Sequence, residues 1–291
     1  MLTPELLFAL RNLPLAARQA AEGFLAGAHA SRRQGAGMEF SQYRPYQPGD
    51  DLRRLDWRLA ARSDKYFLRE SEVDTSLTVN LVLDASASLG HPDDSGLTKL
   101  DYARLLLAAL AYLAQKQGDA VGLTLLLPTG LRQLPPRADA RQLPRLYHAL
   151  ETVAATGSFP DAATLAPLTA RRQRALTVCA SDLYEENGEI TRLLTRLRAT
   201  SGDVLLLHLM AGNELNFSYH GAVTLRDLET GHTVQVDADQ QRAGYQRQLQ
   251  TWLRDTAQAA RRQGLDYHLL DTSQPLDGAL REFLKRRQLM R

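Results

Sequence analysis

The chain of 291 residues has a single cysteine, Cys179, and no long uninterrupted apolar run. One cysteine excludes an internal disulfide framework, which is typical of proteins in a reducing compartment. No segment approaches the roughly 20 apolar residues that a membrane-spanning helix needs. The first 20 residues are interrupted by Glu5, Arg11 and Arg18, which argues against a signal peptide. We therefore expect a cytoplasmic protein without a membrane span.

The charge balance and the aromatic content limit the classes of partner. The formal net charge is only +2, aromatic residues make up 7% of the chain, and the basic cluster Arg171-Arg172-Arg174 contains no aromatic side chain. Proteins that bind single-stranded nucleic acids combine basic grooves with aromatic stacking platforms. We therefore expect no nucleic-acid partner. With 44% hydrophobic residues the chain has ample material for a core.

Motifs of the common enzyme classes are missing as well. The sequence has no GxxxxGK[ST] loop for nucleoside triphosphates and no HExxH pair for zinc. Ser86 and Ser88 lack the flanking glycines of a nucleophile elbow. The segment Asp84-Ala85-Ser86 lacks the second acid of an Asp-x-Asp phosphotransferase loop. These absences favour a protein that is not an enzyme.

What the sequence does contain is an apolar strand that ends in polar residues, the segment LTVNLVLDASAS at 77–88. A near-continuous apolar run is typical of a central parallel strand that is covered on both faces. Further strands of this kind are expected at 120–127, 175–180, 204–210 and 266–270. Helices are expected at 99–117, 139–154, 187–199, 238–263 and 276–287. Repeated βα units predict an α/β fold with a parallel sheet and right-handed crossovers.

The segments outside this pattern give the remaining organisation. Helical spacing is continuous over 4–28, and a loop-rich stretch follows it. We expect a helical and loop extension over residues 1–75, packed on an α/β domain over 76–291. A proline-rich segment after Leu127 is expected to be a loop. A small β-hairpin insertion is expected near 215–237.

Polar side chains follow two of the expected strands. Asp84, Ser86 and Ser88 are spaced by two, so in an extended loop their side chains converge on one side. Asp182 follows the strand 175–180 closely, and it reaches the same edge of the sheet if the two strands are neighbours. Carboxylates and hydroxyls are hard oxygen donors that suit Mg²⁺ or Mn²⁺. The alternative is that both acids cap the helices that follow them.

The segment Asp84-Ala85-Ser86-Ala87-Ser88 resembles the DxSxS signature of the metal-ion-dependent adhesion site in von Willebrand factor A domains. This resemblance implies a Rossmann-like parallel sheet flanked by helices, and a third loop that adds a hydroxyl ligand to the cation. Here the third loop reads ATGSFPDAATL, in which Thr156, Ser158 and Thr164 are candidates. Thr156 is the hydroxyl that we assign to the site, although the loop departs from the usual Gly-Thr context.

A second constellation interleaves acids and arginines between residues 35 and 62. Its charged residues are Glu39, Asp50, Asp51 and Asp56 with Arg44, Arg53, Arg54, Arg58 and Arg62. Charges mixed this densely form an Arg–carboxylate lattice that fastens a loop to its domain, with Trp57 as an apolar anchor. An alternative is a metal-dependent hydrolase or nuclease centre that uses the acids of 39–56.

The same segment resembles the signature of the domain of unknown function 58 family, bacterial proteins with a von Willebrand factor A-like domain. The positions that carry the resemblance include Glu39, Arg44, Tyr46, Gly49, Asp50, Arg53, Asp56, Trp57 and Arg62. Glu214, residues 227–231, Tyr245 and residues 270–272 extend the resemblance toward the C-terminus. The resemblance implies a frequent partner, an AAA+ ATPase of the MoxR class. It also implies a chaperone-like role in assembling or activating another, unidentified protein.

These observations lead to one main hypothesis and two alternatives. The main hypothesis is a non-enzymatic protein-interaction module. In it, a cation at Asp84, Ser86, Ser88 and Asp182 accepts a carboxylate from a partner protein, because a hard dication with open positions pairs strongly with carboxylate oxygen. The first alternative is the metal-dependent hydrolase of residues 39–56. The second is a scaffold whose degenerate site binds no metal.

Overall fold

The structure is a computed structural model that describes six parts of the chain, residues 3–34, 43–46, 66–69, 76–160, 173–184 and 188–290. The chain divides into two compact units. Met1–Phe24 and Ser76–Arg291 together form the first unit, and Leu25–Thr75 form the second.

In the second unit the described residues include two short strands, β1 (Tyr43–Pro45) and β2 (Phe67–Arg69). They pair antiparallel, with Arg44 opposite Leu68. Most of the signature segment lies outside the described residues, namely Glu39, Gly49, Asp50, Arg53, Asp56, Trp57 and Arg62. The Arg–carboxylate lattice and the alternative hydrolase centre therefore both stay predictions.

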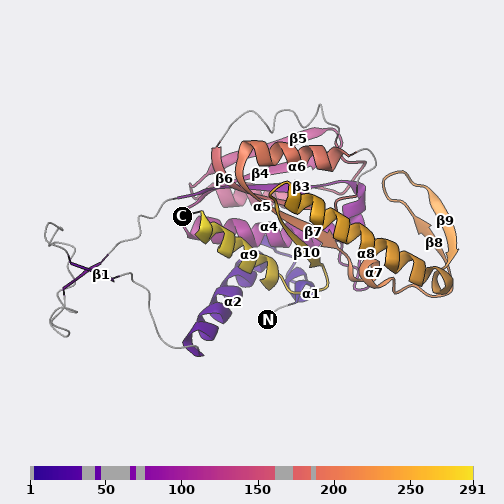
Figure 1. The fold of residues 1–291 in the computed structure, drawn as a ribbon, viewed down its shortest axis with the longest axis horizontal. Coiled ribbons are helices and arrows are strands. Elements are labelled where there is room, and N and C mark those ends of the chain that lie inside the picture. The colour runs from indigo at the N-terminus through magenta and orange to yellow at the C-terminus, as the bar shows by residue number, and fades with distance from the viewer. Residues whose placement is uncertain are drawn as a thin grey trace. The chain divides into compact units, whose positions relative to one another are not determined.

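A six-stranded sheet forms the centre of the first unit, in the order β10-β7-β6-β3-β4-β5 (Figure 1). The strands are β3 (Thr78–Asp84), β4 (Ala120–Leu127), β5 (Gly130–Arg137), β6 (Gln173–Ser181), β7 (Ser201–Met210) and β10 (Asp266–Asp271). All neighbouring strands run parallel except β4 and β5. The prediction of an α/β fold with a mostly parallel sheet is confirmed.

The edge strand β5 corrects one prediction. The sequence predicts a loop after Leu127, but Gly130–Arg137 pair antiparallel with β4. Proline lacks the N–H that a sheet ladder needs, so it is confined mostly to edge strands, where one side has no partner. Pro135 and Pro136 lie in such an edge strand. The loop prediction is wrong because proline is compatible with an edge strand as well as with a loop.

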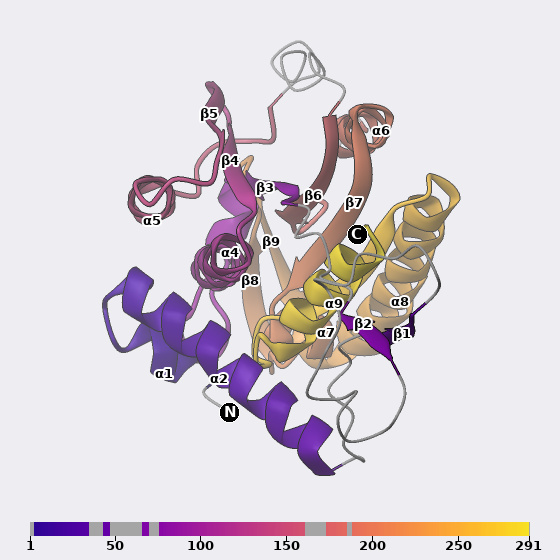
Figure 2. The ribbon, with the colours of Figure 1, turned by 90° about the vertical axis from the view of Figure 1, so that its left-hand side faces the viewer.

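Helices cover both faces of the sheet (Figure 2). The helices α4 (Lys99–Lys116), α5 (Gln142–Thr152) and α9 (Asp277–Leu289) pack on one face, and α6 (Glu189–Thr200) and α8 (Ala238–Arg262) on the other. Strand β3 is buried on both sides. Leu81 and Leu83 are almost fully inaccessible, while Val82 belongs to a cluster with Cys179 and Leu193. Each such side chain contributes roughly 1.5–3 kcal/mol by its burial.

Helix α4 begins at the carboxyl edge of the sheet, and its start is fixed by a capping box. Asp101 N donates to Thr98 Oγ1 at 3.1 Å, while Thr98 N donates to Asp101 Oδ2 at 3.4 Å. The helix ends at Lys116, and Gly118 follows with φ +79°, a left-handed conformation that glycine adopts readily. The cap places Lys99, the first helical residue, at the edge where Asp84 ends β3.

The N-terminal helical region also differs from its prediction. The sequence predicts continuous helical spacing over 4–28, whereas the structure has α1 (Pro4–Phe8) and α2 (Leu13–Gln34). Arg11 has φ +48° between them. Asn12 Oδ1 accepts the N–H of Leu15 at 2.9 Å, which is the contact of an N-terminal cap. The pair Asn12 and Pro14 was the signal for this break, because both residue types favour a helix start.

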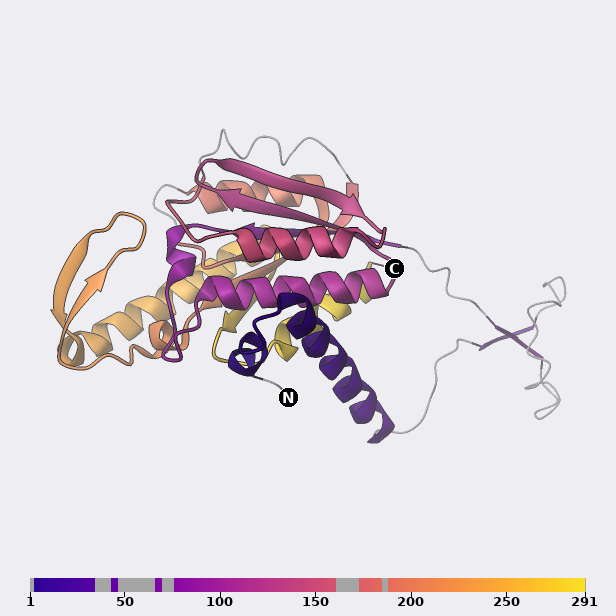
Figure 3. The same ribbon diagram turned by 180° about the vertical axis from the view of Figure 1, so that it is seen from behind.

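A two-stranded hairpin of β8 (Ala222–Arg226) and β9 (Thr233–Asp237) projects from the sheet domain (Figure 3). It follows the short helix α7 (Gly212–Asn216) and confirms the predicted hairpin. Both strands are largely exposed, so the hairpin adds little to the core. Its ends meet where Ala238 N donates to Gly221 O at 2.8 Å. None of the helices in the described ranges has the length and apolar character that a bilayer crossing requires.

Candidate functional site

The predicted site lies at the topological switch point of the sheet. Strand β3 pairs with β4 on one side and with β6 on the other, with Leu83 opposite Ala180. The chain leaves β3 toward β4 and returns later to β6, so the strand order reverses between β3 and β6. Open α/β sheets bind their ligands outside the carboxyl ends of strands at this point. Asp84 ends β3 and Asp182 directly follows β6, as the sequence predicts.

The polar side chains of residues 84–88, called the DASAS loop below, form one hydrogen-bonded network. Asp84 is fully buried, and its Oδ1 accepts the N–H of Ser86 at 2.9 Å. Its Oδ2 accepts the hydroxyl of Ser181 at 2.6 Å. The hydroxyls of Ser86 and Ser88 lie 3.0 Å apart and share a hydrogen bond. Ser181, the last residue of β6 before Asp182, is a member of this network that was not predicted from the sequence.

Burial makes the carboxyl of Asp84 unusually basic. Desolvation, and then the negative charge of Asp182, raise the pKa of Asp84 to about 7, against the opposing hydrogen bonds from Ser181 and Ser86. A substantial fraction of this carboxyl is therefore protonated at neutral pH unless a positive charge lies beside it. Burial also raises the pKa of the Cys179 thiol to about 12, which agrees with its predicted role as a buried apolar residue.

A buried lysine is the main feature that the sequence analysis missed. Lys99 Nζ donates to Asp182 Oδ2 and to Glu214 Oε1, both at 2.9 Å. The Lys99 and Asp182 side chains are fully inaccessible, and that of Glu214 is 13% exposed. Burial lowers the pKa of Lys99, but the two carboxylates outweigh it and raise that pKa above its ordinary value. Lys99 therefore remains an ammonium ion.

One oxygen of Asp182 has no partner. Its Oδ1 is buried and makes no hydrogen bond within the described part of the chain. Leu183 follows in a left-handed conformation with φ +57°, and its N–H donates to Ser181 Oγ at 3.0 Å. A buried carboxylate oxygen without a partner is unfavourable by roughly 1–3 kcal/mol or more. This oxygen is therefore available to a ligand, and Asp182 is close enough for its charge to act on Asp84.

The third loop reaches the site through its backbone. Thr156 N donates to Ala85 O at 3.0 Å, and Ala87 N donates to Gly157 O at 2.8 Å. Gly157 has φ +63°, and a Cβ there would lie 2.8 Å from Pro128 Cβ, so the close approach requires glycine. Thr156 itself is exposed. The loop lies beside DASAS, as predicted, and whether the Thr156 hydroxyl is a ligand stays a prediction.

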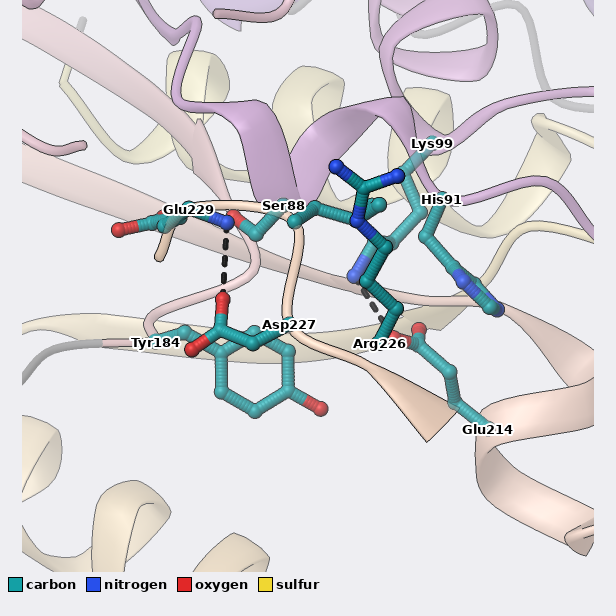
Figure 4. A pocket seen from close by; sticks show the side chains of 9 residues that line it. Ser88, His91, Lys99, Tyr184, Glu214, Arg226, Asp227 and Glu229 are labelled. Atoms are coloured by element: carbon teal, nitrogen blue, oxygen red, sulfur yellow. Dashed lines mark hydrogen bonds and ion pairs between the residues drawn. The ribbon is translucent and has the colours of Figure 1, made fainter. Parts of the chain in front are cut away.

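A cavity of about 350 Å³ opens at this edge of the sheet (Figure 4). Ser88, Lys99 and Glu214 line it from the sheet domain. Arg226 and residues 227–229, from the end of β8 and the hairpin turn, line its other part. The hairpin is thus part of the candidate site. Its turn, residues 227–231, carries part of the family resemblance, but the sequence did not place it beside the sheet edge.

The oxygen donors at this edge fit a small hard cation. The DASAS loop supplies the carboxylate of Asp84 and two hydroxyls, and the neighbouring strand supplies the unpartnered Oδ1 of Asp182. Such donors, completed by water, are those that Mg²⁺ prefers. Across the described ranges no three His, Cys, Asp or Glu side chains gather as a metal-ligand group. A cation here would therefore depend on serine hydroxyls and water as well as on the acids.

Comparisons with known proteins complete the description. The family model described as "Protein of unknown function DUF58" matches residues 42–253. Uncharacterized proteins of Mycobacterium tuberculosis and Mycobacterium bovis are 30% identical over 232 residues, or 78% of this chain and 72% of theirs. The solved structure of the conserved hypothetical protein BatB from Bacteroides thetaiotaomicron aligns with a TM-score of 0.46 and 13% identity, over 74% of this chain and 100% of that one. A von Willebrand factor type A structure from Catenulispora acidiphila aligns with a TM-score of 0.34 and 13% identity, over 46% of this chain and 33% of that one.

Proposed function

Because this chain belongs to the DUF58 family, whose function is unassigned, we propose that it is a non-catalytic protein-interaction module that receives its partner at the carboxyl edge of its sheet. The observation that carries the proposal is the unpartnered Oδ1 of Asp182, buried beside the network of Asp84, Ser86 and Ser88. An unpartnered oxygen of this kind at a switch point is a site for a ligand, and the network beside it includes Ser88, which also lines the cavity.

In this proposal the recognition is bridged by Mg²⁺ or Mn²⁺. Asp84, Ser86 and Ser88 hold the cation together with Asp182, and Thr156 belongs to the loop beside them. The bound cation supplies a positive charge with open coordination positions, which attract a carboxylate of the partner. Lys99 Nζ holds Oδ2 of Asp182, which leaves Oδ1 available to the cation.

The partner that we propose is an AAA+ ATPase of the MoxR class, acting with this chain on an unidentified client protein. Support comes from the resemblance of residues 37–62 to the signature of the family. ATP-driven work would be done by the ATPase, because this sequence contains no GxxxxGK[ST] loop. The single cysteine of this chain is consistent with a cytoplasmic location.

A second candidate function is a scaffold that needs no metal. It is favoured by Lys99, whose ammonium ion already neutralises part of the negative charge at the site. In this version Lys99 is the permanent cation of the edge, and partner binding does not respond to Mg²⁺.

A titration of the purified MoxR-class ATPase into this protein separates the two candidates. We expect the two proteins to bind in Mg²⁺. EDTA should weaken this binding about tenfold or more because it removes the cation, and Ser88→Ala should do the same because it removes one ligand of the cation. Ser218→Ala is the matched control, since Ser218 is exposed and does not line the cavity. Equal affinity in Mg²⁺ and EDTA would favour the metal-free scaffold. No binding under either condition would exclude this ATPase as the partner.

A further inference from the structure

Among the described residues that line the cavity, one arginine has a side chain without a hydrogen-bond or ion-pair partner in the described ranges. Arg226 ends β8, is exposed and lines the cavity (Figure 4). Its guanidinium has no hydrogen bond or ion pair with any side chain in the described part of the structure. Lys99, the other cation of the lining, is held by Asp182 and Glu214. Arg226 is therefore available to an anion from outside.

Two acids of the cavity are already committed to internal contacts. Glu214 accepts Lys99 at Oε1 and the N–H of Ala211 at Oε2, the latter at 2.8 Å. Asp227 Oδ2 accepts the Thr230 hydroxyl at 2.7 Å, and its Oδ1 accepts the N–H of Glu229 at 2.8 Å. These hydrogen bonds, chiefly the one from Thr230, hold the pKa of Asp227 below its ordinary value. Within the described residues, neither acid makes a hydrogen bond or an ion pair with Arg226.

We propose that Arg226 is the docking group for a carboxylate of the partner, an Asp or Glu side chain on an acidic peptide segment that enters the cavity. This inference rests on the proposed function and names its second recognition element. A guanidinium presents paired N–H donors that match the two oxygens of a carboxylate. Two acidic side chains of the same partner segment are then bound. The cation site at the sheet edge holds one, and Arg226 on the hairpin holds the other.

The charge of the cavity selects a carboxylate over a phosphate. Glu214, Asp227 and Glu229 all line it, so an incoming anion experiences repulsion that grows with its own charge. A carboxylate carries a single negative charge, whereas a phosphate group carries nearly two at neutral pH. The carboxylate is therefore the anion that Arg226 binds with the smaller opposing repulsion.

The test is a fluorescence anisotropy titration with a labelled short peptide of alternating Glu and Gly, in saturating Mg²⁺ and in EDTA. We expect saturable binding that Arg226→Ala weakens about tenfold, as expected for loss of a charged hydrogen-bonded pair. Arg226→Lys keeps the positive charge but not the paired N–H donors, so its affinity for the peptide should lie between those of the wild-type protein and Arg226→Ala. Glu229→Gln should strengthen binding severalfold, since it removes a negative charge from the lining.

Arg247→Ala is the matched control, because Arg247 is exposed on α8 and lies outside the cavity lining. Equal affinity of the wild-type protein and Arg226→Ala, or no saturable binding in either buffer, would overturn the inference. So would displacement of the peptide by inorganic phosphate at lower concentration than by acetate.

The two buffers separate this inference from the metal bridge. Binding that depends on Arg226 equally in EDTA and in Mg²⁺ supports the inference and refutes the bridge. Binding that requires Mg²⁺ but does not respond to Arg226→Ala refutes the inference and leaves the bridge intact.

Discussion

At the scale of single residues, Lys99 occupies a position that its local context disfavours. It is the first residue of α4, where the helix dipole is positive and a cation is unfavourable. Its two carboxylate partners are 83 and 115 residues away in the chain. Long-range ion pairs of this kind explain the position, and they leave no trace in a local sequence pattern.

We predict that Lys99→Met lowers the free energy of unfolding by about 3–5 kcal/mol, because it leaves a buried carboxylate without its counter-charge. Lys116→Met is the control on the same helix: Lys116 is 51% exposed and lies 3.8 Å from Glu22. That change should cost less than about 1 kcal/mol. Urea unfolding followed by circular dichroism measures both. Equal effects of the two changes would mean that the ion pairs of Lys99 with Asp182 and Glu214 do not stabilise the fold.

Asp84 gives a prediction about pH. Its pKa is raised from 3.8 to about 7 in the folded protein, so between these values the folded state binds more protons than the unfolded state. The free energy of unfolding of the metal-free protein should therefore contain a contribution that falls as pH rises through this window. Asp84→Asn lacks the titrating carboxyl and should lose that contribution. Urea unfolding at a series of pH values in EDTA tests this, and the same pH slope in both proteins would contradict it.

The residues of the site were predictable only in part. Asp84, Ser86, Ser88 and Asp182 could be found because they follow apolar strands, and parallel strands end at a common edge. Ser181, Lys99 and Arg226 could not, since their roles arise from contacts between distant segments or from the hairpin. The orientation of Asp182, with one oxygen paired and one free, is likewise a property of tertiary packing.

Among the helices and strands, the hairpin of β8 and β9 is explained by its role in the candidate site and not by a contribution to stability. An isolated two-stranded hairpin is marginally stable in water, and both β8 and β9 are largely exposed. Yet the hairpin brings Arg226 to the cavity. Its closed base, where Gly221 and Ala238 share a hydrogen bond, allows it to be removed without stretching the chain.

We predict that replacing Ala222–Val236 by two glycines leaves the fold intact and weakens binding of the Glu-Gly peptide by up to about tenfold, because Arg226 is lost. Asp237 is kept, because its Oδ1 accepts the N–H of Asp239 and caps α8. The melting temperature should change by less than about 4 °C, which corresponds to about 1 kcal/mol for a domain of this size. Differential scanning calorimetry and the anisotropy titration measure the two effects. Undiminished peptide binding would contradict the role of the hairpin.

Most helices and strands were predictable because their apolar residues repeat with the period of the element. The exceptions include β5 and the break between α1 and α2. In both cases proline was decisive. Pro135 and Pro136 lie in an edge strand that the sequence suggested was a loop, while Pro14 supports a helix start that the apolar spacing concealed.

At the scale of the whole molecule, the candidate site is assembled by the topology. The order of the sheet places β3 beside β6, α4 adds Lys99, α7 adds Glu214, and the hairpin adds Arg226. The alternation of strands and helices was enough to predict the fold class. The assembly of a cavity from these segments required the structure. The contribution of residues 37–62, most of which lie outside the described residues, remains a prediction from their resemblance to the family.

Calorimetric titration of the metal-free protein with Mg²⁺ is the decisive test of whether the sheet edge at Asp84 binds a divalent cation. We predict a single saturable binding event that is lost in Asp84→Asn, weakened in Ser88→Ala and unchanged in Ser218→Ala. Binding should also release protons near neutral pH, because the cation displaces the proton from the Asp84 carboxyl. The absence of saturable binding, or the same isotherm for Asp84→Asn and the wild-type protein, would contradict the account.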